Sequence, residues 1–470
     1  MHDRATPLWR FAGGRGVAAS PTLLVGSLAV SVAAAVALAD ERLERPTLVA
    51  AAAVLVAAVL LLTPLFPLAL AMIASLPFAD WKPPGCPLSI SVLLAVVIGV
   101  RVLVELPALR PLRSHAIVRW TALPLLLVPS AFLGAASIGA RGQLFFSIAS
   151  WLAIALIVAH FVDERRWPIV RRLLLAELVV ALVIGGFEVL AQRWLVPLPD
   201  PPVIRAEYFF GYFRPRSITL SPYALGEFLA FTAPLVWYEL GLALRGDRLR
   251  RLAWLSVVAA GQFALLVATL SRKSLWQVLV AAVVFLLVSL GDLRLRSRIV
   301  VVTAGIAGLA LLAVNLNGPA FSERLTSSTS AEGVSVRMNT YADAVQIGTA
   351  HLPLGAGLGN FVATSTDRYG EQFAAYNSFA EAFSDSGLLG LLAVFAIVGL
   401  PIGLALRTGS RIAPPRAVAV SVLVGLLALA TVESSIWRKS LAFSVGLCLA
   451  VYVNGRERTP ARLPSPEGAR

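Results

Sequence analysis

The chain is poor in charge. Only 14% of its 470 residues are charged, and lysine occurs only three times. Soluble proteins carry about 25% charged residues and about 45–50% apolar ones, whereas this sequence is 58% hydrophobic and has a mean hydropathy of +0.80. These values exclude a soluble enzyme and a disordered chain.

Cysteine and histidine are scarce too. The two cysteines, Cys86 and Cys448, lie far apart, and Cys448 falls inside an apolar run. This excludes a disulfide scaffold. None of the four histidines forms a pair with metal-ligand spacing, so we expect neither a metal site nor a cofactor. Nucleotide-binding P-loops, kinase signatures and the G-x-S-x-G motif of hydrolases are absent as well.

Long apolar runs dominate what is present. Continuous runs of about 20 apolar residues are typical of membrane-spanning helices, whereas a membrane β-barrel requires short alternating segments. We therefore expect an all-α polytopic membrane protein with about 12–14 spans. The expected spans are 21–39, 47–62, 64–77, 88–105, 117–138, 143–161, 172–190, 222–243, 252–270, 274–290, 299–315, 386–406, 417–433 and 440–454. The region 47–77 can be a hairpin broken at Thr63-Pro64 or one long tilted helix.

The basic residues predict the orientation. The net charge of +14 would suggest nucleic acid in a soluble protein, but in a membrane protein arginine collects in cytoplasmic loops. With the N-terminus in the cytoplasm, 24 of the 40 basic residues are cytoplasmic, 15 lie on the other side, and Arg101 lies within a span. This orientation places the N-terminus on the cytoplasmic side of a membrane.

Two long segments interrupt the spans, and both fall on the outer side. They are 191–221 and 316–385. Long ordered loops in a compact protein are usually functional, so the chemistry is expected there. We therefore divide the chain into an N-terminal bundle (1–315), a large outer loop (316–385), three C-terminal spans (386–455) and a disordered cytoplasmic tail (456–470).

Arginines on the outer side oppose the orientation bias and need a reason. Arg205, Arg214 and Arg216 come shortly before a helix that is predicted to begin at Ser221-Pro222. Serine caps a helix, proline favours its first turn, and a helix N-terminus beside guanidinium groups suits an anion. Contact with lipid phosphates is the alternative interpretation.

A second outer group joins two apolar runs in ATLSRKSLWQ. Its short turn places Arg272 and Lys273 at the membrane boundary. They can be interfacial anchors that extend to the surface. Because the Arg214 segment lies on the same face, they can instead belong to one site with it.

The large outer loop carries the third group. GVSVRMNTYADAVQIGTA is predicted to be an amphipathic helix with Arg337, and LPLGAGLGNF a glycine-rich turn. No strand precedes that turn, so it is not a dinucleotide site. Asn377, Glu381 and Asp385 then share one helical stripe. This stripe can supply a general base or be a solvated face.

Taken in order, these segments resemble the O-antigen ligase and polymerase family of membrane glycosyltransferases. The resemblance rests on RPRSITLSPYALGEFLAF, TLSRKSL, RMNTYADAVQIGTAHLPLGAGLGNF and YNSFAEAFSDSGLLGLL. It implies a helical membrane fold of glycosyltransferase type C with a large extracytoplasmic helical loop. It also implies a place in a bacterial inner membrane with the active face and the loop 316–385 in the periplasm. There the glycan would be transferred from an undecaprenyl-diphosphate carrier, without a metal or a nucleotide sugar.

By position, the resemblance assigns roles to residues. Arg216 and Arg272 match the family's arginines, and Glu381 matches an acidic position, so these three are expected to be catalytic. Tyr376 and Asn377 stand where ligases of the family have His-Asn. Because tyrosine is a poor base at neutral pH, we favour a polymerase. The expected substrate-binding residues are Arg205, Arg214, Lys273, Arg337, Tyr376 and Asn377.

The expected partners are the lipid-linked donor, a glycan acceptor, membrane lipids and a chain-length regulator, but no nucleic acid. The alternatives are an O-antigen ligase acting on lipid A-core, a flippase for lipid-linked oligosaccharide, a peptidoglycan-type glycan polymerase and a scaffold of an export complex. Transporters tend to have internal repeats and polar residues near the membrane midplane. In this sequence the polar residues gather on one face, with Arg101 as the main exception.

Overall fold

A computed structural model describes most of the chain. The described residues are 63–78, 94, 97–99, 109–133, 138–196, 208–209, 212–245, 249–289, 328–361, 375–408, 414–433 and 438–458. The expected spans at 21–39, 47–62 and 299–315, most of 88–105, the tail beyond 458, and Arg205 lie outside these residues.

The described residues form helices and one short β-ribbon, in which β1 (Tyr208–Phe209) pairs antiparallel with β2 (Tyr212–Phe213). Within the described part of the chain, four helices are long and apolar enough to cross a membrane: α8 (Trp167–Ala191), α9 (Pro222–Arg245), α10 (Leu249–Ala268) and α15 (Ser378–Leu406). At this level the expectation of a helical membrane protein is confirmed. The other helices are α3 (Leu65–Ala74), η1 (Leu76–Phe78), η3 (Arg110–Arg113), α5 (His115–Ala122), η4 (Leu123–Leu127), α6 (Val128–Ala131), α7 (Ile138–Phe161), α11 (Arg272–Val288), α13 (Ser328–Ala350), α16 (Arg416–Ala430) and α17 (Lys439–Arg458).

Most helix ends lie close to the sequence prediction, because local signals determine them. Helix α9 begins at Pro222, and the Ser221 hydroxyl accepts a hydrogen bond from the Ala224 amide at 3.2 Å. The expected single helix at 117–138 is wrong. It is divided into α5, η4 and α6, since Pro124 and Pro129 each lack the amide hydrogen that a continuous helix needs.

Helix α15 differs from the prediction in its start. It begins at Ser378 instead of near 386, and it bends at Gly387, which has φ 61° and ψ −155°. Only glycine adopts this conformation readily. The span expected at 386–406 is therefore the second part of a longer, kinked helix, whose first turns belong to the segment that we assigned to the large loop.

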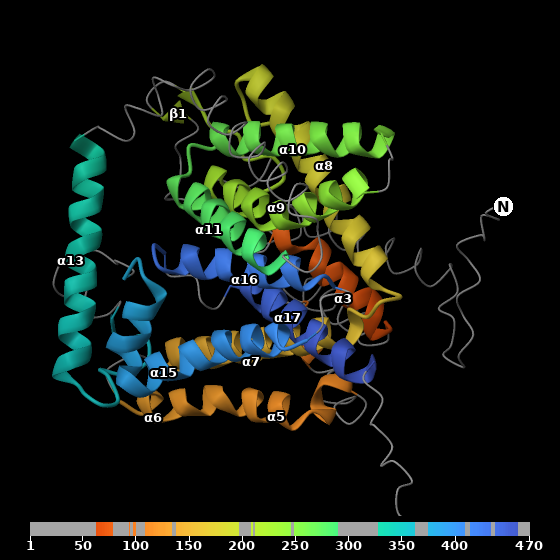
Figure 1. Cartoon of the computed structure of the whole chain (residues 1–470). Helices are drawn as coiled ribbons and strands as arrows, with labels where there is room; N and C mark the ends of the chain where they lie inside the picture. Colours follow the sequence, from red (N-terminus) through yellow and green to blue (C-terminus); the bar gives the residue numbers. More distant parts are fainter. Residues whose placement is uncertain are drawn as a thin grey trace, which may run out of the picture.

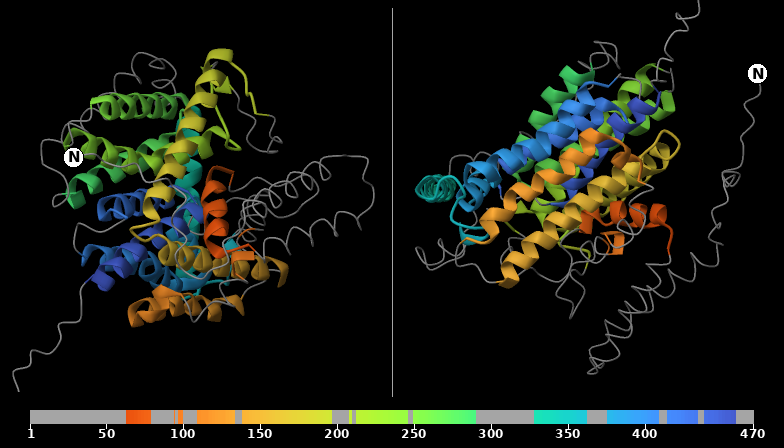
Figure 2. Two further views of the ribbon diagram at one scale, coloured as in Figure 1. Left: turned by 90° about the vertical axis from the view of Figure 1, so that its right-hand side faces the viewer. Right: turned by 90° about the horizontal axis from the view of Figure 1, so that it is seen from below.

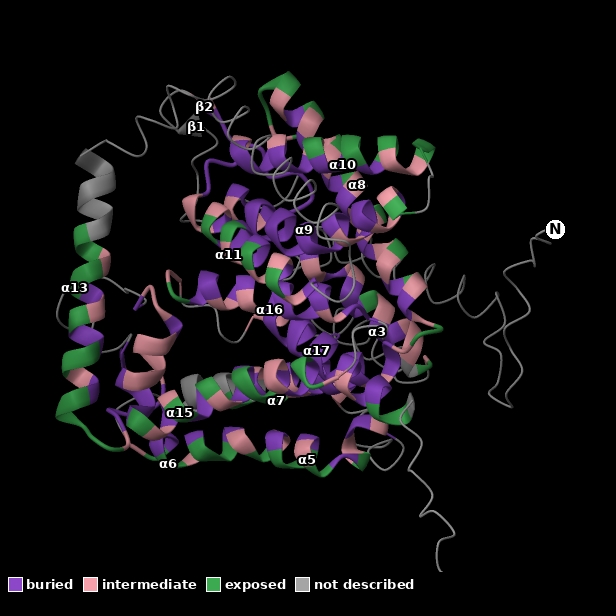
Figure 3. Cartoon of the chain, in the orientation of Figure 1, coloured by how far each residue is buried: buried purple, intermediate pink, exposed green. Residues whose placement is uncertain are grey.

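Helices α9, α16 and α17 are central and almost entirely buried, while α5, α8 and α10 present exposed apolar faces (Figure 3). One large apolar cluster joins α7, α8, α9, α10, α11, α16 and α17. A polar contact joins α5 to α15, because the Trp120 indole donates to the Ile397 carbonyl at 2.8 Å. An exposed apolar surface around a buried core is expected of a helix bundle in lipid.

Helix α13 lies across one end of the bundle. In Figure 1 it runs upright while α7, α9, α10, α11 and α16 run roughly across the view, and Figure 2 shows it end-on beside the bundle from below. The Tyr341 hydroxyl on α13 donates to the carbonyls of Tyr376 at 2.9 Å and Thr431 at 3.2 Å. We call this end of the bundle the α13 end.

The opposite end is held by Arg110. Its guanidinium group donates to Asn454 at 2.6 Å and to Glu457 at 2.7 Å, both near the C-terminus of α17. It also donates to the carbonyl of His160, at the end of α7, at 3.2 Å. These contacts join η3, α7 and α17 at the end of the bundle away from α13.

Candidate functional site

Four helices begin at the α13 end: α9, α11, α15 and α17. Each helix N-terminus carries a partial positive charge from its aligned peptide dipoles. Helix α16 ends at the same place, and Glu433 after it contacts Lys273 of α11, Arg438 before α17 and Ser378 of α15. Both the backbone and the side chains described below therefore make this end of the bundle suited to an anion.

Four charged side chains join these helices, and we call them the ion cluster: Glu227, Lys273, Glu433 and Arg438. Lys273 on α11 and Arg438 before α17 both donate to the carboxylate of Glu433, which follows α16. Arg438 also donates to Glu227 on α9, whose carboxylate accepts from the Ser440 hydroxyl at 3.2 Å. One cluster thus ties α9, α11, α16 and α17 together.

Glu433 lies between two cations. Burial would by itself raise its pKa, but the positive charges of Arg438 and Lys273 outweigh burial, and the pKa is held below its ordinary value. Glu433 is therefore ionised at neutral pH. The geometry is that of an anion site whose occupant is a side chain of the same protein.

Arg214 adjoins this cluster through an aromatic ring. Its guanidinium carbon lies 4.4 Å from the centre of the Tyr223 ring, and the Lys273 amine lies 5.1 Å from the same centre. The Arg214 Nε donates to the Thr269 carbonyl at 2.9 Å. The first and second groups that we singled out in the sequence are therefore in contact. The gain from such cation–aromatic contacts grows when water is excluded.

Arg216 lies in the same segment. Its guanidinium carbon is 4.2 Å from the centre of the Trp194 ring, and its Nη2 donates to the Val196 carbonyl at 2.8 Å. Arg214 is 0% exposed and Arg216 is 3% exposed. Both guanidinium groups lie beneath the surface. Lys273 and Arg438 are partly exposed by comparison.

A buried carboxylate holds the arginine segment in place. Glu188, near the end of α8, accepts hydrogen bonds from the amides of Arg216 at 2.9 Å, Ser217 at 2.7 Å and Leu195 at 3.0 Å. Ser217 is also tied by its hydroxyl, which donates to the Ala181 carbonyl at 2.8 Å. The backbone of the arginines is thus fixed independently of their guanidinium groups.

Strained backbone occurs at one predicted site residue and close to two others. Ser217, Leu270 and Tyr376 have φ values of 52°, 52° and 51°. Each such residue costs about 1–3 kcal/mol and persists only where its surroundings impose it. Ser217 follows Arg216, Leu270 lies two residues before Arg272, and Tyr376 is itself a predicted substrate-binding residue.

Arg272 is the first residue of α11, follows the Ser271 N-cap, and is partly exposed. Near α15, Tyr376 packs under Arg337, whose guanidinium carbon is 5.3 Å from the ring centre. The side chain of Asn377 caps α15 by accepting from the amides of Phe379 at 2.9 Å and Ala380 at 3.0 Å. Glu381 lies in the first turn of α15 and is partly buried.

Asp385 does not form a solvated face with Glu381. It is buried, and its carboxylate accepts from the amides of Gly359 and Phe361, both at 2.9 Å. The glycine-rich turn therefore packs on the kink of α15. A Cβ on Gly355 would lie 2.4 Å from the Gly387 nitrogen, so this turn brings backbone against backbone.

Sequence reasoning missed Glu188, Glu227, Glu433 and Arg438. One signal was available for Glu227, because an acidic residue shortly inside an apolar span usually has a partner. Glu433 and Arg438 gave no local signal, since their partners lie in other helices. The chain matches no model of a known protein family and no curated protein sequence.

Proposed function

We propose that this chain is a membrane glycosyltransferase that polymerises a glycan carried on undecaprenyl diphosphate. In this proposal the α13 end faces the periplasm of a bacterium, the complete bundle has about 12–14 spans, and its fold is of glycosyltransferase type C. The donor, the acceptor and a chain-length regulator are its partners.

The observation that carries the proposal is the gathering of cations at one end of an apolar bundle. Arg214 and Lys273 share the Tyr223 ring, and Lys273 and Arg438 converge on Glu433. A leaving diphosphate develops negative charge, and fixed cations in a site of low water content stabilise such charge strongly. A lipid-linked donor also explains why such a site would lie at the end of membrane helices.

The proposed reaction is a single displacement. The hydroxyl oxygen of the acceptor sugar forms a bond to the anomeric carbon of the donor, and the bond from that carbon to the diphosphate oxygen breaks. Arg216 and Arg272 neutralise the leaving diphosphate, with Arg214 and Lys273 beside them. Arginine suits this role because its planar guanidinium group binds two phosphate oxygens at once.

The acceptor side of the proposal concerns Glu381. It lies in the first turn of α15, next to the Asn377 cap and on the side of the bundle that α13 covers. We assign to Glu381 the proton that leaves the acceptor hydroxyl. Tyr376, Asn377 and Arg337 then bind the acceptor sugar.

The test uses purified protein in lipid nanodiscs and one lipid-linked oligosaccharide donor, with release of undecaprenyl diphosphate as the readout. Arg216→Ala and Arg272→Ala are expected to lower turnover by about 10²–10³-fold, the usual cost of removing one group that stabilises developing charge. The corresponding lysine variants are expected to recover part of this loss. Arg165→Ala, at an exposed position at the start of α8, is the control.

The products distinguish the alternatives. Polymer formed from the donor alone supports a polymerase, and transfer only to added lipid A-core would identify a ligase. Movement of the donor across the bilayer without release of diphosphate would identify a flippase. Wild-type turnover in both alanine variants would remove the two arginines from the mechanism.

A further inference from the structure

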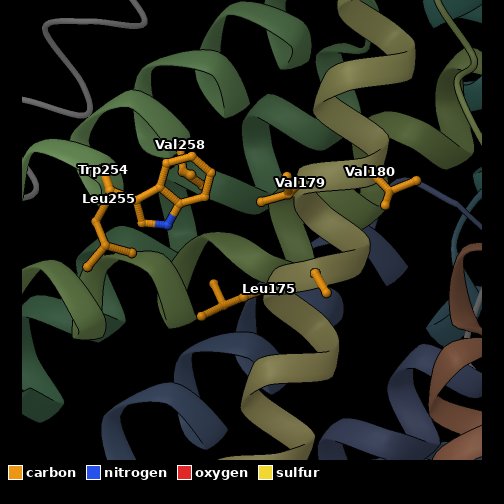
Figure 4. Close-up of a pocket in the computed structure, with 7 residues that line it drawn as sticks. Leu175, Val179, Val180, Trp254, Leu255 and Val258 are labelled. Carbon is orange, nitrogen blue, oxygen red and sulfur yellow. The ribbon is translucent and has the colours of Figure 1, made fainter. Parts of the chain in front are cut away.

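A hollow lies between α8 and α10, away from the site described above. It has a volume of about 370 Å³, and its walls are Leu175, Ala176 and Val179 of α8 and Trp254, Leu255 and Val258 of α10. Figure 4 shows Leu175 and Val179 pointing from α8 toward α10, with Trp254 and Val258 opposite them. Every side chain that lines the hollow is apolar.

The packing of the two helices explains the hollow. Nearer the α13 end α8 and α10 approach closely at Gly185, which has no side chain, while Gly261 lies in ordinary contact with α8. A Cβ on Gly185 would lie 2.6 Å from Leu265, and one on Gly261 would lie 3.7 Å from Leu182. The residues that line the hollow precede these contacts in both helices, so the hollow lies closer to the opposite end of the bundle.

An ion triad fixes the two helices beyond the hollow. Glu239 of α9 is 1% exposed, and it pairs with Arg171 of α8 at 2.9 Å and with Arg251 of α10. Replacing either arginine would leave a buried carboxylate short of a partner. The separation between α8 and α10 at this depth is therefore set by the fold and does not need a ligand.

Two further arginines lie about one helical turn before the walls of the hollow, on the same two helices. Arg172 precedes Leu175 and Ala176 by three and four residues, and Arg250 precedes Trp254 by four, so each lies above a wall of the hollow on its own helix. One helical turn, about 6 Å, separates each arginine from the apolar wall. Both side chains are exposed, and neither has an ion-pair partner among the described residues.

We propose that this hollow binds one anionic phospholipid, with an acyl chain between α8 and α10 and the phosphate between Arg172 and Arg250. The apolar walls match a hydrocarbon chain, and the two exposed arginines one turn above them match an anionic headgroup. Basic pockets between membrane helices bind anionic lipids in this way. Trp254, which is 53% exposed, has the position expected of an aromatic residue at a membrane interface.

The charges distinguish this lipid from others. A zwitterionic phospholipid carries its own cation, so two exposed arginines favour it less than a lipid of net negative charge.

This lipid site does not depend on the proposed glycosyltransferase function. The orientation predicted from the basic residues places the hollow in the cytoplasmic leaflet, whereas the ion cluster lies at the other end of the bundle.

The experiment is native mass spectrometry of the purified full chain, titrated with phosphatidylglycerol or with phosphatidylcholine of the same acyl chains. Wild-type protein is expected to bind one phosphatidylglycerol in preference to phosphatidylcholine. The double variant Arg172→Gln/Arg250→Gln is expected to bind phosphatidylglycerol about 25-fold more weakly, at about fivefold for each arginine. Arg119→Gln/Arg407→Gln, which removes two exposed arginines elsewhere, is the matched control and keeps wild-type affinity.

A second pair of variants tests the apolar part. Ala176→Phe fills the hollow and is expected to lower the affinity, while Ala260→Phe, at an exposed position of α10 outside the hollow, is not. Gel filtration confirms that each variant is folded. Equal binding of the two phospholipids by wild-type protein, or wild-type affinity in the arginine double variant, contradicts the proposal. Binding of a polyprenyl diphosphate that the Arg172→Gln/Arg250→Gln variant weakens more than it weakens binding of phosphatidylglycerol would assign the hollow to that other lipid and would also overturn the proposal.

Discussion

The anchoring of the arginine segment by Glu188 gives the most quantitative prediction. Its carboxylate is 0% exposed and accepts three amide hydrogens, from Leu195 through Oε1 and from Arg216 and Ser217 through Oε2. Glutamine in its place offers one oxygen and one NH2 group. If the oxygen stays on Arg216 and Ser217, the NH2 group faces the Leu195 amide, donor against donor.

The magnitude follows from the number of amides left without an acceptor. One buried amide that loses its partner costs about 1–3 kcal/mol. This corresponds to hydrogen exchange at that amide that is faster by about 5- to 150-fold, if exchange proceeds through local opening. In Glu188→Gln we expect this change at Leu195 and a smaller one at Arg216 and Ser217. In Glu188→Ala all three amides are expected to exchange faster.

The assay is hydrogen–deuterium exchange with mass spectrometry on peptides that cover Leu195 and 212–221. Glu457→Gln is the control, because it removes a carboxylate at the opposite end of the bundle and should leave these peptides unchanged. Donor binding is expected to weaken in parallel with exchange, since Arg216 lies in the same segment. Unchanged exchange in Glu188→Ala would refute the idea that this carboxylate holds the arginine segment.

Four further predictions concern the α13 end and the kink of α15. Glu433→Gln removes a carboxylate whose pKa is lowered in the folded protein. The stability that this carboxylate adds is present above the ordinary glutamate pKa of about 4.3, and it is lost as the pH falls through the lower folded value. The melting temperature of the variant should therefore depend less on pH on the acid side than that of the wild type. Gly387→Ala places a Cβ 2.1 Å from the Pro353 carbonyl oxygen at φ 61° and should lower the melting temperature, whereas Gly399→Ala, with open space in the same helix, should not. Glu381→Gln should reduce turnover by about 10²–10⁴-fold if Glu381 is the general base, and near-wild-type turnover would end that assignment. A cysteine at Ser328 should react with a membrane-impermeant reagent in intact cells while one at Ser410 is protected, and the reverse pattern would invert the proposed orientation.

The sequence was a good guide to individual helices. The start of α9 at Pro222 was predicted because proline and a capping serine act within one turn of the chain. Proline acts equally locally at Pro124 and Pro129, where it divides the helix expected at 117–138. The kink at Gly387 was not predicted, because it depends on the glycine-rich turn that packs against it from a distant segment.

The candidate site was predicted only in part, for a similar reason. The sequence predicted three site residues, Arg214, Arg216 and Lys273, because they are basic and lie on the outer side, where the orientation bias leaves few basic residues. Periodicity suggested Asn377 and Asp385 as parts of a polar stripe, but in the structure one caps α15 and the other holds a turn. A helical period shows which residues share a face, and it does not show what that face contacts.

The sequence by itself determined that this protein is a helical membrane protein, because long apolar runs leave the backbone no other way to satisfy its hydrogen bonds in lipid. Only the tertiary structure decided which charges meet. Lys273 and Glu433 are 160 residues apart in the chain, and Glu227 and Arg438 are 211 apart. Their pairing depends on how α9, α11, α16 and α17 pack at the α13 end, and that packing is set by side-chain shape along whole helices, which no local pattern in the sequence encodes.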